Sequence, residues 1–423
     1  MNAPVVLFVY NRLDHTMNVI SSLAQNLLAK ETDLYVFSDA AKTEKGLPQV
    51  SAVRDYIRKK DWRSGFGNVT IVEAEHNKGL AKSIIGGVTE ILKKYGKVIV
   101  VEDDLVLSPY FLKYMNDALE YYKDASDIWS ISGYSFPMKS LRNYPHDVFY
   151  SYRGTSWGWA TWLDRWEKTD WEVKNYSEFV KNKAWKKRFE RGGDDLPGML
   201  AAQMEGKINS WAIRWVFTQS NLDMYTIYPK KSYVLNDGCD GSGTHVGDTD
   251  EYQTDIQDSG KNCCFEKLEI DKKIAREFWY KYSDTLNKKI VRNLKKYKSF
   301  IAYAIFGVFT TIVNIVTYNI CYSNWGISNT ISNIIAWILA VTFAYLTNKA
   351  WVFESRSWKW AVLRKEVPAF IGCRLATGVL DIAIMFVCVD ILKWPAMIMK
   401  IASNVIVIIL NYIFSKLVIF KKR

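Results

Sequence analysis

The stretch VIVVEDDLVL, residues 98–107, places three adjacent acidic residues directly after a run of four apolar ones. The apolar run has the composition of a buried strand, and apolar residues return immediately after the acids. Neighbouring carboxylates repel one another and are costly to remove from water, so their charge must be compensated. The stretch therefore predicts a buried strand that ends in a functional site at Glu102, Asp103 and Asp104.

Strand and helix patterns alternate over the first hundred residues. Candidate strands lie at 4–10, 33–38, 68–75 and 97–102, and helical stretches separate them at 13–28, 47–60 and 79–95. This alternation is typical of a parallel sheet, in which ligands bind at the carboxyl ends of the strands. Neither GxGxxG nor GxxxxGK[ST] occurs, so neither a dinucleotide-binding fold nor a P-loop is supported.

Polar residues follow each of the four strands. They are Tyr10, Asn11 and Arg12 after the first, Asp39 after the second, Asn77, Lys78, Gly79 and Leu80 after the third, and the acidic triplet after the fourth. Because these ends share one edge of the sheet, we expect one site. Carboxylates hold a hard divalent cation and leave coordination positions for phosphate oxygens. The pattern therefore predicts a nucleotide site that uses Mg²⁺ or Mn²⁺.

Residues 1 to about 285 resemble a GT-A glycosyltransferase, with VIVVEDDLVLSPYF in the place of the DxD-type motif and NKGLAKSI (77–84) in the donor-binding region. The nearest resemblance is to metal-dependent inverting enzymes whose motif reads EDD, such as N-acetylglucosaminyltransferase I-like enzymes. It implies that Asp104 binds the metal, that Glu102 faces the ribose, and that Asp39 and Asn11 lie near the base. It also suggests His245 as a late metal or phosphate ligand, although a surface histidine is the common alternative.

Two tryptophan-rich segments extend the resemblance. SWGWATW (156–162) is similar to the segment that lines the sugar and acceptor site, and SWAIRW (210–215) to the catalytic segment. The candidate lining residues are therefore Trp157, Gly158, Trp159 and Trp211. Aromatic rings commonly stack on sugars, but these tryptophans fit an ordinary core equally well.

The second segment departs from the family pattern at residues 212–214. The inverting relatives carry an aspartate base there, whereas this chain has Ala-Ile-Arg. Either Glu205, Asp194 or Asp195 supplies the base, or no base is needed. A phosphate acceptor is already an anion at neutral pH and needs no deprotonation, which would suit a polyprenyl phosphate acceptor.

From about residue 300 the chain consists mostly of apolar runs long enough to cross a bilayer. Four spans can be drawn at about 300–322, 330–348, 367–389 and 396–415. We therefore divide the chain into a GT-A-like domain (1–289), a basic linker (290–299) and an all-helical membrane domain (300–423). The loop charges and the positive-inside rule predict a multi-pass inner-membrane protein with both termini and the α/β domain in the cytoplasm.

The membrane half repeats itself with a shift of 67 residues, which places Tyr345 on Tyr412 and Lys349 on Lys416. Its span layout, with the NKAWVF and NYIFSKLVIF ends, resembles the GtrA family. That family comprises four-span proteins associated with polyprenyl-phosphate-linked sugars and proposed to move such lipids across the membrane.

Ionisable residues inside the predicted spans are Arg374, Asp381 and Lys400. Such residues are costly in a membrane and are candidates for function. A lipid phosphate would suit Arg374 and Lys400. The alternative is that Arg374 and Asp381, two turns apart on one helix face, contact each other and only fix the packing.

The formal net charge of +12 needs a partner. The densest basic cluster, at 288–298, directly precedes the first span, a position that suits anionic lipids rather than nucleic acid. The six cysteines lack metal-ligand spacing and are interpreted as reduced thiols, and the N-terminus carries no signal peptide pattern. The sequence does not decide whether the chain forms a homo-oligomer.

These observations predict a metal-dependent inverting glycosyltransferase that moves a sugar from a nucleotide sugar to polyprenyl phosphate in cell-surface glycan synthesis. One alternative is transfer to a lipid-linked oligosaccharide or a cell-wall polymer, with the membrane half as an anchor. Another is a lipid-linked sugar translocator whose α/β domain only binds its ligand.

Overall fold

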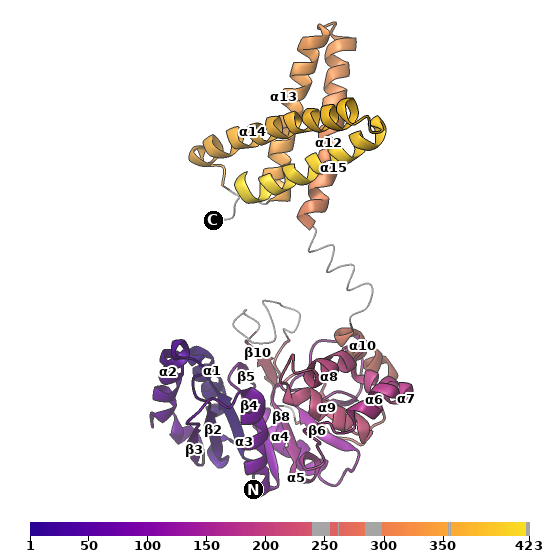
Figure 1. Cartoon of the computed structure of the whole chain (residues 1–423). Helices are drawn as coiled ribbons and strands as arrows, with labels where there is room; N and C mark the ends of the chain where they lie inside the picture. Colours follow the sequence, from indigo (N-terminus) through magenta and orange to yellow (C-terminus); the bar gives the residue numbers. More distant parts are fainter. Residues whose placement is uncertain (239–253, 261, 284–297, 354, 356, 420–423) are drawn as a thin grey trace. The chain divides into compact units, whose positions relative to one another are not determined.

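The computed structural model describes residues 1–238, 254–260, 262–283, 298–353, 355 and 357–419 (Figure 1). The chain divides into two compact units, Met1–Asp284 and Thr285–Arg423. Within the described part of the chain, Cys264, Cys321, Cys373 and Cys388 form no disulfide bond.

The first unit is built on an eight-stranded sheet in the order β3-β2-β1-β4-β8-β6-β9-β7. The four predicted strands are confirmed as β1 (Val5–Val9), β2 (Leu34–Ser38), β3 (Val69–Glu73) and β4 (Lys97–Glu102), and they pair in parallel. The other strands are β6 (Ile128–Ser132), β7 (Val148–Ser151), β8 (Trp159–Trp162) and β9 (Tyr225–Pro229). This second half is mixed, because β8 runs antiparallel to both β4 and β6 while β9 runs parallel to β6 and antiparallel to β7.

Ten α-helices accompany the sheet in the described part of this unit. They are α1 (Leu13–Ala24), α2 (Leu47–Arg58), α3 (Leu80–Tyr95), α4 (Phe111–Tyr121), α5 (Leu163–Trp166), α6 (Tyr176–Lys181), α7 (Lys183–Phe189), α8 (Leu196–Met204), α9 (Trp211–Asn221) and α10 (Lys272–Tyr282). The three helical stretches predicted between the first four strands are therefore confirmed as α1, α2 and α3.

The central strands β1 and β4 are buried on both faces, which explains their continuous apolar runs. Alternate residues of β1 point to opposite faces, so Leu7 packs with α1, α2 and α4 while Phe8 packs with α3 and with tryptophans of α5, β8 and α9. Burial on both faces is typical of parallel strands covered by helices on each side. The first unit is therefore a layered α/β domain.

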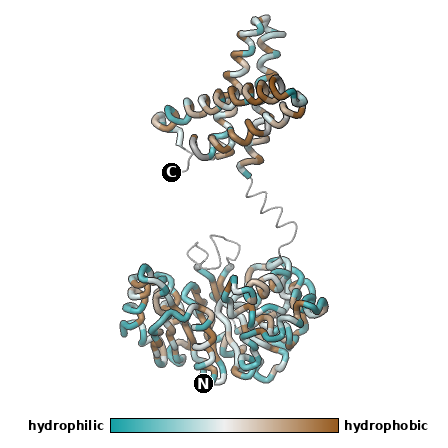
Figure 2. The backbone as a smooth tube through the Cα atoms, in the orientation of Figure 1, coloured by the Kyte–Doolittle hydropathy of each residue, from teal (hydrophilic) through white to brown (hydrophobic). Residues whose placement is uncertain are grey.

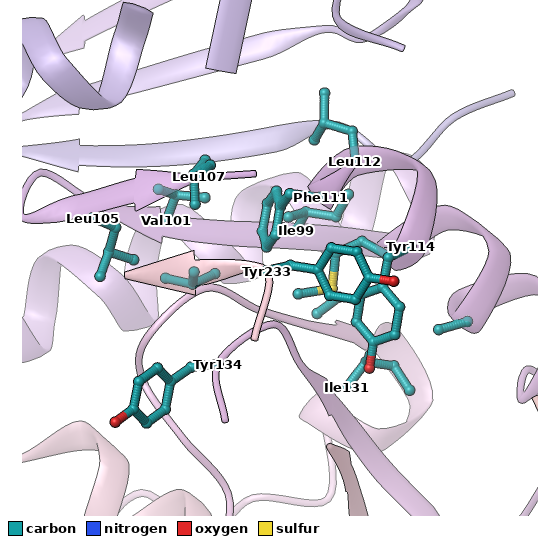
Figure 3. Close-up of a cluster of buried hydrophobic side chains, with 14 of the residues drawn as sticks. Ile99, Val101, Leu105, Leu107, Phe111, Leu112, Tyr114, Ile131, Tyr134 and Tyr233 are labelled. Atoms are coloured by element: carbon teal, nitrogen blue, oxygen red, sulfur yellow. The ribbon is translucent and has the colours of Figure 1, made fainter. Parts of the chain in front are cut away.

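The acidic stretch turns sharply at the end of β4. Glu102 is the last residue of β4, and β5 (Leu105–Leu107) follows at once and pairs antiparallel with β10 (Val234–Asn236). Figure 3 shows Val101, Leu105 and Leu107 in the same hydrophobic cluster as Phe111. The apolar residues on both sides of the acids thus anchor the turn in the core and hold the carboxylates at its edge.

The second unit contains α12 (Lys298–Asn319), α13 (Asn329–Thr347), α14 (Trp360–Met385) and α15 (Ala396–Phe414). Three helical segments of the described chain are long and apolar enough to cross a membrane, namely Lys298–Asn324, Asn329–Val352 and Trp360–Cys388. Figure 2 shows hydrophobic residues along these helices. α15 covers the predicted fourth span but is not among these three, so the count of four stays a prediction.

The helix bounds confirm the predicted repeat. A shift of 67 residues carries α13 onto α15, and it carries the π-helical turn Asn348–Val352 onto the turn Ser415–Ile419. α12 packs mainly on α13, and α14 mainly on α15. The second unit therefore consists of two copies of a helical hairpin.

Candidate active site

A cavity of about 1190 Å³ opens at the carboxyl ends of β1, β2 and β4. It is lined by all eleven residues predicted from the strand ends to form the nucleotide and metal site, namely Tyr10, Asn11, Arg12, Asp39, Asn77, Lys78, Gly79, Leu80, Glu102, Asp103 and Asp104. Its volume exceeds the usual range for small-molecule sites and leaves space for a second substrate. The parallel order of the strands thus brings together residues that lie far apart in the sequence.

Arg12 compensates the acidic triplet. β1 and β4 are neighbours in the sheet, with Phe8 opposite Glu102, so the residues after each strand meet. Nη2 of Arg12 donates to Asp103 Oδ1 and, at 3.1 Å, to Asp104 Oδ2. The sequence predicted that these acids need a cation but did not assign this role to Arg12.

The carboxyls of the acidic triplet disfavour one another's negative charge. Burial raises the pKa of the Glu102 carboxyl well above its usual range, and Asp104 and Asp103 raise it further. Burial also raises the pKa of Asp103, although the nearby Arg12 offsets part of that effect. The buried carboxyls therefore favour a nearby cation, and Arg12 fills that role in this structure.

The donor set fits a cation that takes only a few ligands from the protein. Among the described residues, no group of three or more His, Cys, Asp and Glu side chains is arranged to hold a metal ion. Mg²⁺, however, is usually bound by one or two carboxylates together with substrate phosphates and water. Asp103 and Asp104 already share one cationic group, Nη2 of Arg12, which stands in for such an ion. His245 lies outside the described residues.

Gly238 closes one side of Asp104. A Cβ atom on Gly238 would lie 2.7 Å from Asp104 Oδ2, too close for any other residue without a shift. The N–H of Asp237 donates to the carbonyl of Asp104 at 2.8 Å. The glycine at position 238 thus allows the backbone after β10 to approach the acidic turn.

Asp39 shapes the loop that precedes α3. Its carboxylate accepts the N–H groups of Lys78 and Gly79, both at 2.9 Å, the amide of Asn77 at 3.1 Å, and the N–H of Ala40. These four donors match the acceptor capacity of a carboxylate. Asp39 therefore lines the cavity but acts mainly by ordering residues 77–79, where Gly79 adopts a φ of +73°.

Only part of the tryptophan prediction fits. Trp157 and Trp211 line the cavity. Trp159 is 1% exposed and stacks on Trp211 and Trp166 in the core, because its place in β8 turns it toward α3 and α9. Gly158 has a φ of +61°, and a Cβ there would lie 2.8 Å from Val234, so its role is close packing. The prediction that Gly158 and Trp159 line the sugar site is therefore wrong.

The three candidate bases lie in different surroundings. Asp195 lines the cavity, whereas Glu205 is exposed and pairs with Lys207, and Asp194 is not among the lining residues. Arg153 binds both oxygens of Asp195, at 2.7 and 2.9 Å, and its guanidinium stacks over Tyr282. Of the three candidate bases, only Asp195 thus reaches the cavity. If Asp195 took up a proton, it would lose its ion pair with Arg153, a pair that the sequence did not predict.

Polar contacts join α14 to α15 in the second unit. Ser403 donates to Asp381 at 2.6 Å, and Thr377 donates to Asn411 at 3.1 Å. The guanidinium of Arg374 lies 5.4 Å from the centre of the Phe370 ring. Asp381 therefore has a partner on the neighbouring helix, and the side chain of Lys400 is outside the described part.

Comparison with known proteins identifies the C-terminal part. Residues 302–420 match the family model for the GtrA/DPMS transmembrane domain. The cell wall teichoic acid glycosylation protein GtcA of Listeria monocytogenes is 44% identical over 127 residues, which are 30% of this chain and 86% of that protein. This chain belongs to the GtrA/DPMS family. The membrane protein YwcD of Bacillus subtilis is 37% identical over 120 residues, 28% of this chain and 94% of that protein.

The GtrA resemblance predicted from the span ends is therefore confirmed, and the chain is a membrane protein through its GtrA/DPMS domain. Solved structures similar to the chain include residues 1–349 of S. aureus TarS, 12% identical with a TM-score of 0.32 over 85% of this chain and 93% of that one. The galactosyltransferase LgtC is 14% identical with a TM-score of 0.27 over 53% and 72%. Scores this low do not establish a shared fold, and the resemblance of the acidic motif to N-acetylglucosaminyltransferase I-like enzymes stays a prediction.

The GtrA/DPMS domain also contains a buried ion pair that the sequence did not predict. Nζ of Lys349 lies 2.5 Å from Glu366 Oε2, and the Lys349 side chain is fully buried. Tyr345 donates to the same carboxylate oxygen at 3.0 Å. This pair joins the first hairpin of the domain to the start of the second.

Proposed function

We propose that the chain is a membrane-bound, metal-dependent inverting glycosyltransferase that transfers a sugar from a nucleotide sugar to polyprenyl phosphate. The observation that carries this proposal is the cavity at the strand ends, where Asp103 and Asp104 lie together and Gly238 packs against Asp104. Membership of the GtrA/DPMS family supports a membrane-bound substrate. The name of the relative GtcA, a cell wall teichoic acid glycosylation protein, supports a role in the bacterial cell surface.

Asp104 and Asp103 would hold Mg²⁺ or Mn²⁺, which supplies charge stabilisation for the departing diphosphate. The chain contributes further positive potential around that position. α3 begins at Leu80 without a side-chain cap, so the N–H groups of its first turn suit phosphate oxygens. Lys42, Lys78 and Lys82 also line the cavity. These groups favour a donor that carries a diphosphate.

The acceptor side favours a phosphate over a hydroxyl. Arg214 stands in the segment where the inverting relatives carry a base, and it donates to the carbonyls of Ser210 and Trp171. Asp195, the one candidate base at the cavity, is bound by Arg153. A phosphate acceptor attacks the anomeric carbon without losing a proton, and in-line attack opposite the leaving diphosphate inverts the configuration.

The arrangement in the membrane follows from the loop charges. We propose that both termini and the α/β unit face the cytoplasm, where nucleotide sugars are made, and that α15 completes four spans. The GtrA/DPMS domain would bind the lipid phosphate.

The test is to incubate the purified full chain with a panel of labelled nucleotide sugars and polyprenyl phosphate, with Mn²⁺ or with EDTA. We expect label in the lipid fraction for one donor, and only when the metal is present. Transfer that continues in EDTA would refute the metal dependence, and label that appears only in added teichoic acid would refute the lipid phosphate acceptor.

A glycan acceptor is the second candidate function, because Asp195 does reach the cavity. Removal of a general base typically costs 10²- to 10⁴-fold in rate. With polyprenyl phosphate as acceptor we expect Asp195→Asn to retain at least about a tenth of wild-type kcat, because no base is needed. Glu205→Gln, at an exposed site, is the control, and kcat for both variants is measured at saturating donor. A loss of 10²-fold or more confined to Asp195→Asn would favour the glycan acceptor.

Arg374 provides a test of the membrane half. We expect Arg374→Gln to raise the KM for polyprenyl phosphate by about tenfold or more and to leave the KM for the nucleotide sugar unchanged, since charge-assisted hydrogen bonds to phosphate are strong. Arg364→Gln removes the same charge at the start of α14 and serves as the control. Wild-type kinetics in a normally inserted Arg374→Gln protein would contradict a lipid-phosphate role.

A further inference from the structure

The guanidinium of Arg12 lies where a divalent cation would be expected. Its Nη2 contacts Asp103 Oδ1 and Asp104 Oδ2, and the side chain lines the same cavity as both carboxylates. We propose that Arg12 competes with the metal ion for Asp103 and Asp104, and that the diphosphate of the donor takes up Arg12 so that metal and nucleotide bind cooperatively. This inference rests on the proposed metal-dependent transferase.

The competition follows from charge and donor geometry. A divalent cation needs carboxylate oxygens that the guanidinium now engages, and an ion placed on the same two carboxylates would lie close to a positive charge that cannot be lost. Asp103 is 7% exposed and Asp104 20%, so water screens this repulsion weakly. Metal alone should therefore bind weakly while Arg12 remains on the carboxylates.

The structure also indicates how Arg12 can move and what it would bind. Its backbone is fixed, because the Arg12 carbonyl accepts the N–H of Thr16 at 3.0 Å and the Thr16 hydroxyl at 2.8 Å. A change of side-chain rotamer is then sufficient to move the guanidinium. Nη1 of Arg12 is shielded from solvent and has no hydrogen-bond partner within the described part of the chain. A buried guanidinium donor that lacks an acceptor suits a phosphate, which arginine binds with paired hydrogen bonds.

The exchange of partners by Arg12 links the affinity for the metal ion to the affinity for the nucleotide. Metal binding releases Arg12 from the carboxylates, and the diphosphate provides new acceptors for it. The diphosphate also offsets the positive charge that the metal adds beside Arg12. Metal and nucleotide should therefore strengthen each other's binding, by the same factor in both directions.

The experiment measures Mn²⁺ binding to the full chain in lipid nanodiscs, from the electron paramagnetic resonance signal of free Mn²⁺. The titrations are made without nucleotide and with UDP, GDP or dTDP. We expect Arg12→Gln to bind Mn²⁺ alone at least about tenfold more tightly than wild type, within the usual range of coupling between sites. The tightening by nucleoside diphosphate should shrink in this variant. Arg12→Lys, which retains the charge but cannot bridge both carboxylates in the same way, should fall between the two and covers the case in which Arg12→Gln fails to fold.

Arg188→Gln is the matched control, because it removes the same charge from an exposed position on α7 and should leave both titrations unchanged. Equal or weaker Mn²⁺ binding by Arg12→Gln, together with intact tightening by nucleotide, would overturn the inference and leave the proposed transferase standing. Failure of the wild type and of both Arg12 variants to bind Mn²⁺ with any of the nucleotides would overturn the metal-dependent function as well.

Discussion

Asp104→Asn is expected to lower the rate of sugar transfer by about 10³-fold or more, since removal of one charge-stabilising group in an active site typically costs 10²- to 10³-fold and this one would also hold the metal. Asparagine keeps the shape of the side chain but loses its charge, and a neutral amide is a poor ligand for a hard cation beside a diphosphate. The backbone contact between the Asp104 carbonyl and the N–H of Asp237 does not depend on the side chain, so the fold should persist. The measurement is kcat/KM for the donor, with circular dichroism to check the fold.

Asp55→Asn is a matched control for this change. Asp55 lies on α2 with 71% of its side chain exposed, and its substitution removes the same charge away from the cavity. We expect wild-type turnover from it. An Asp104→Asn protein that keeps more than about a tenth of the wild-type rate would contradict the assignment of Asp104 as a metal ligand.

The first half of the sheet could be predicted because its signals are local. Each of β1, β2 and β4 is a short apolar run, and polar residues mark its end. The second half could not be predicted, because β8 is inserted between β4 and β6 by contacts over long sequence separations. A four-residue strand such as WATW also does not reveal which face it buries, and this is why the sequence leaves both the site and the core open for Trp159.

The position of the site was predictable, but its ion pairs were not. The rule that parallel strands end at one edge was sufficient to gather Asn11, Asp39 and Asp104 around one cavity. The partners of the charged residues depend on side-chain directions across the fold. Arg12 and Asp103 are 91 residues apart, and Arg153 and Asp195 are 42 residues apart, with no pattern in the sequence to connect them. The periodicity of apolar residues shows which face of a helix or strand is buried. It carries no information on ion pairs such as Arg12–Asp103, which form between different elements.

In the membrane domain, substitution of Lys349 is expected to lower the free energy of unfolding strongly. This lysine is fully buried, and its Nζ contacts Glu366 and, at 3.1 Å, Ser355. Lys349→Met leaves the Glu366 carboxylate buried without its cation, a change that typically destabilises a protein by about 3–5 kcal/mol. We expect a loss of this size in the free energy of unfolding of the purified protein, measured in detergent by titration with a denaturing detergent.

The second hairpin supplies the control for this prediction. Lys416 is the counterpart of Lys349 under the 67-residue shift, but it is exposed. Under the same shift the counterpart of Glu366 is Ser299, which carries no charge. Lys416→Met should therefore change the stability by less than about 0.5 kcal/mol. The double variant Lys349→Met/Glu366→Leu should recover most of the loss, because removal of both charges leaves no unpaired group. Equal losses at Lys349 and Lys416, or no recovery in the double variant, would show that the ion pair does not hold the two hairpins together.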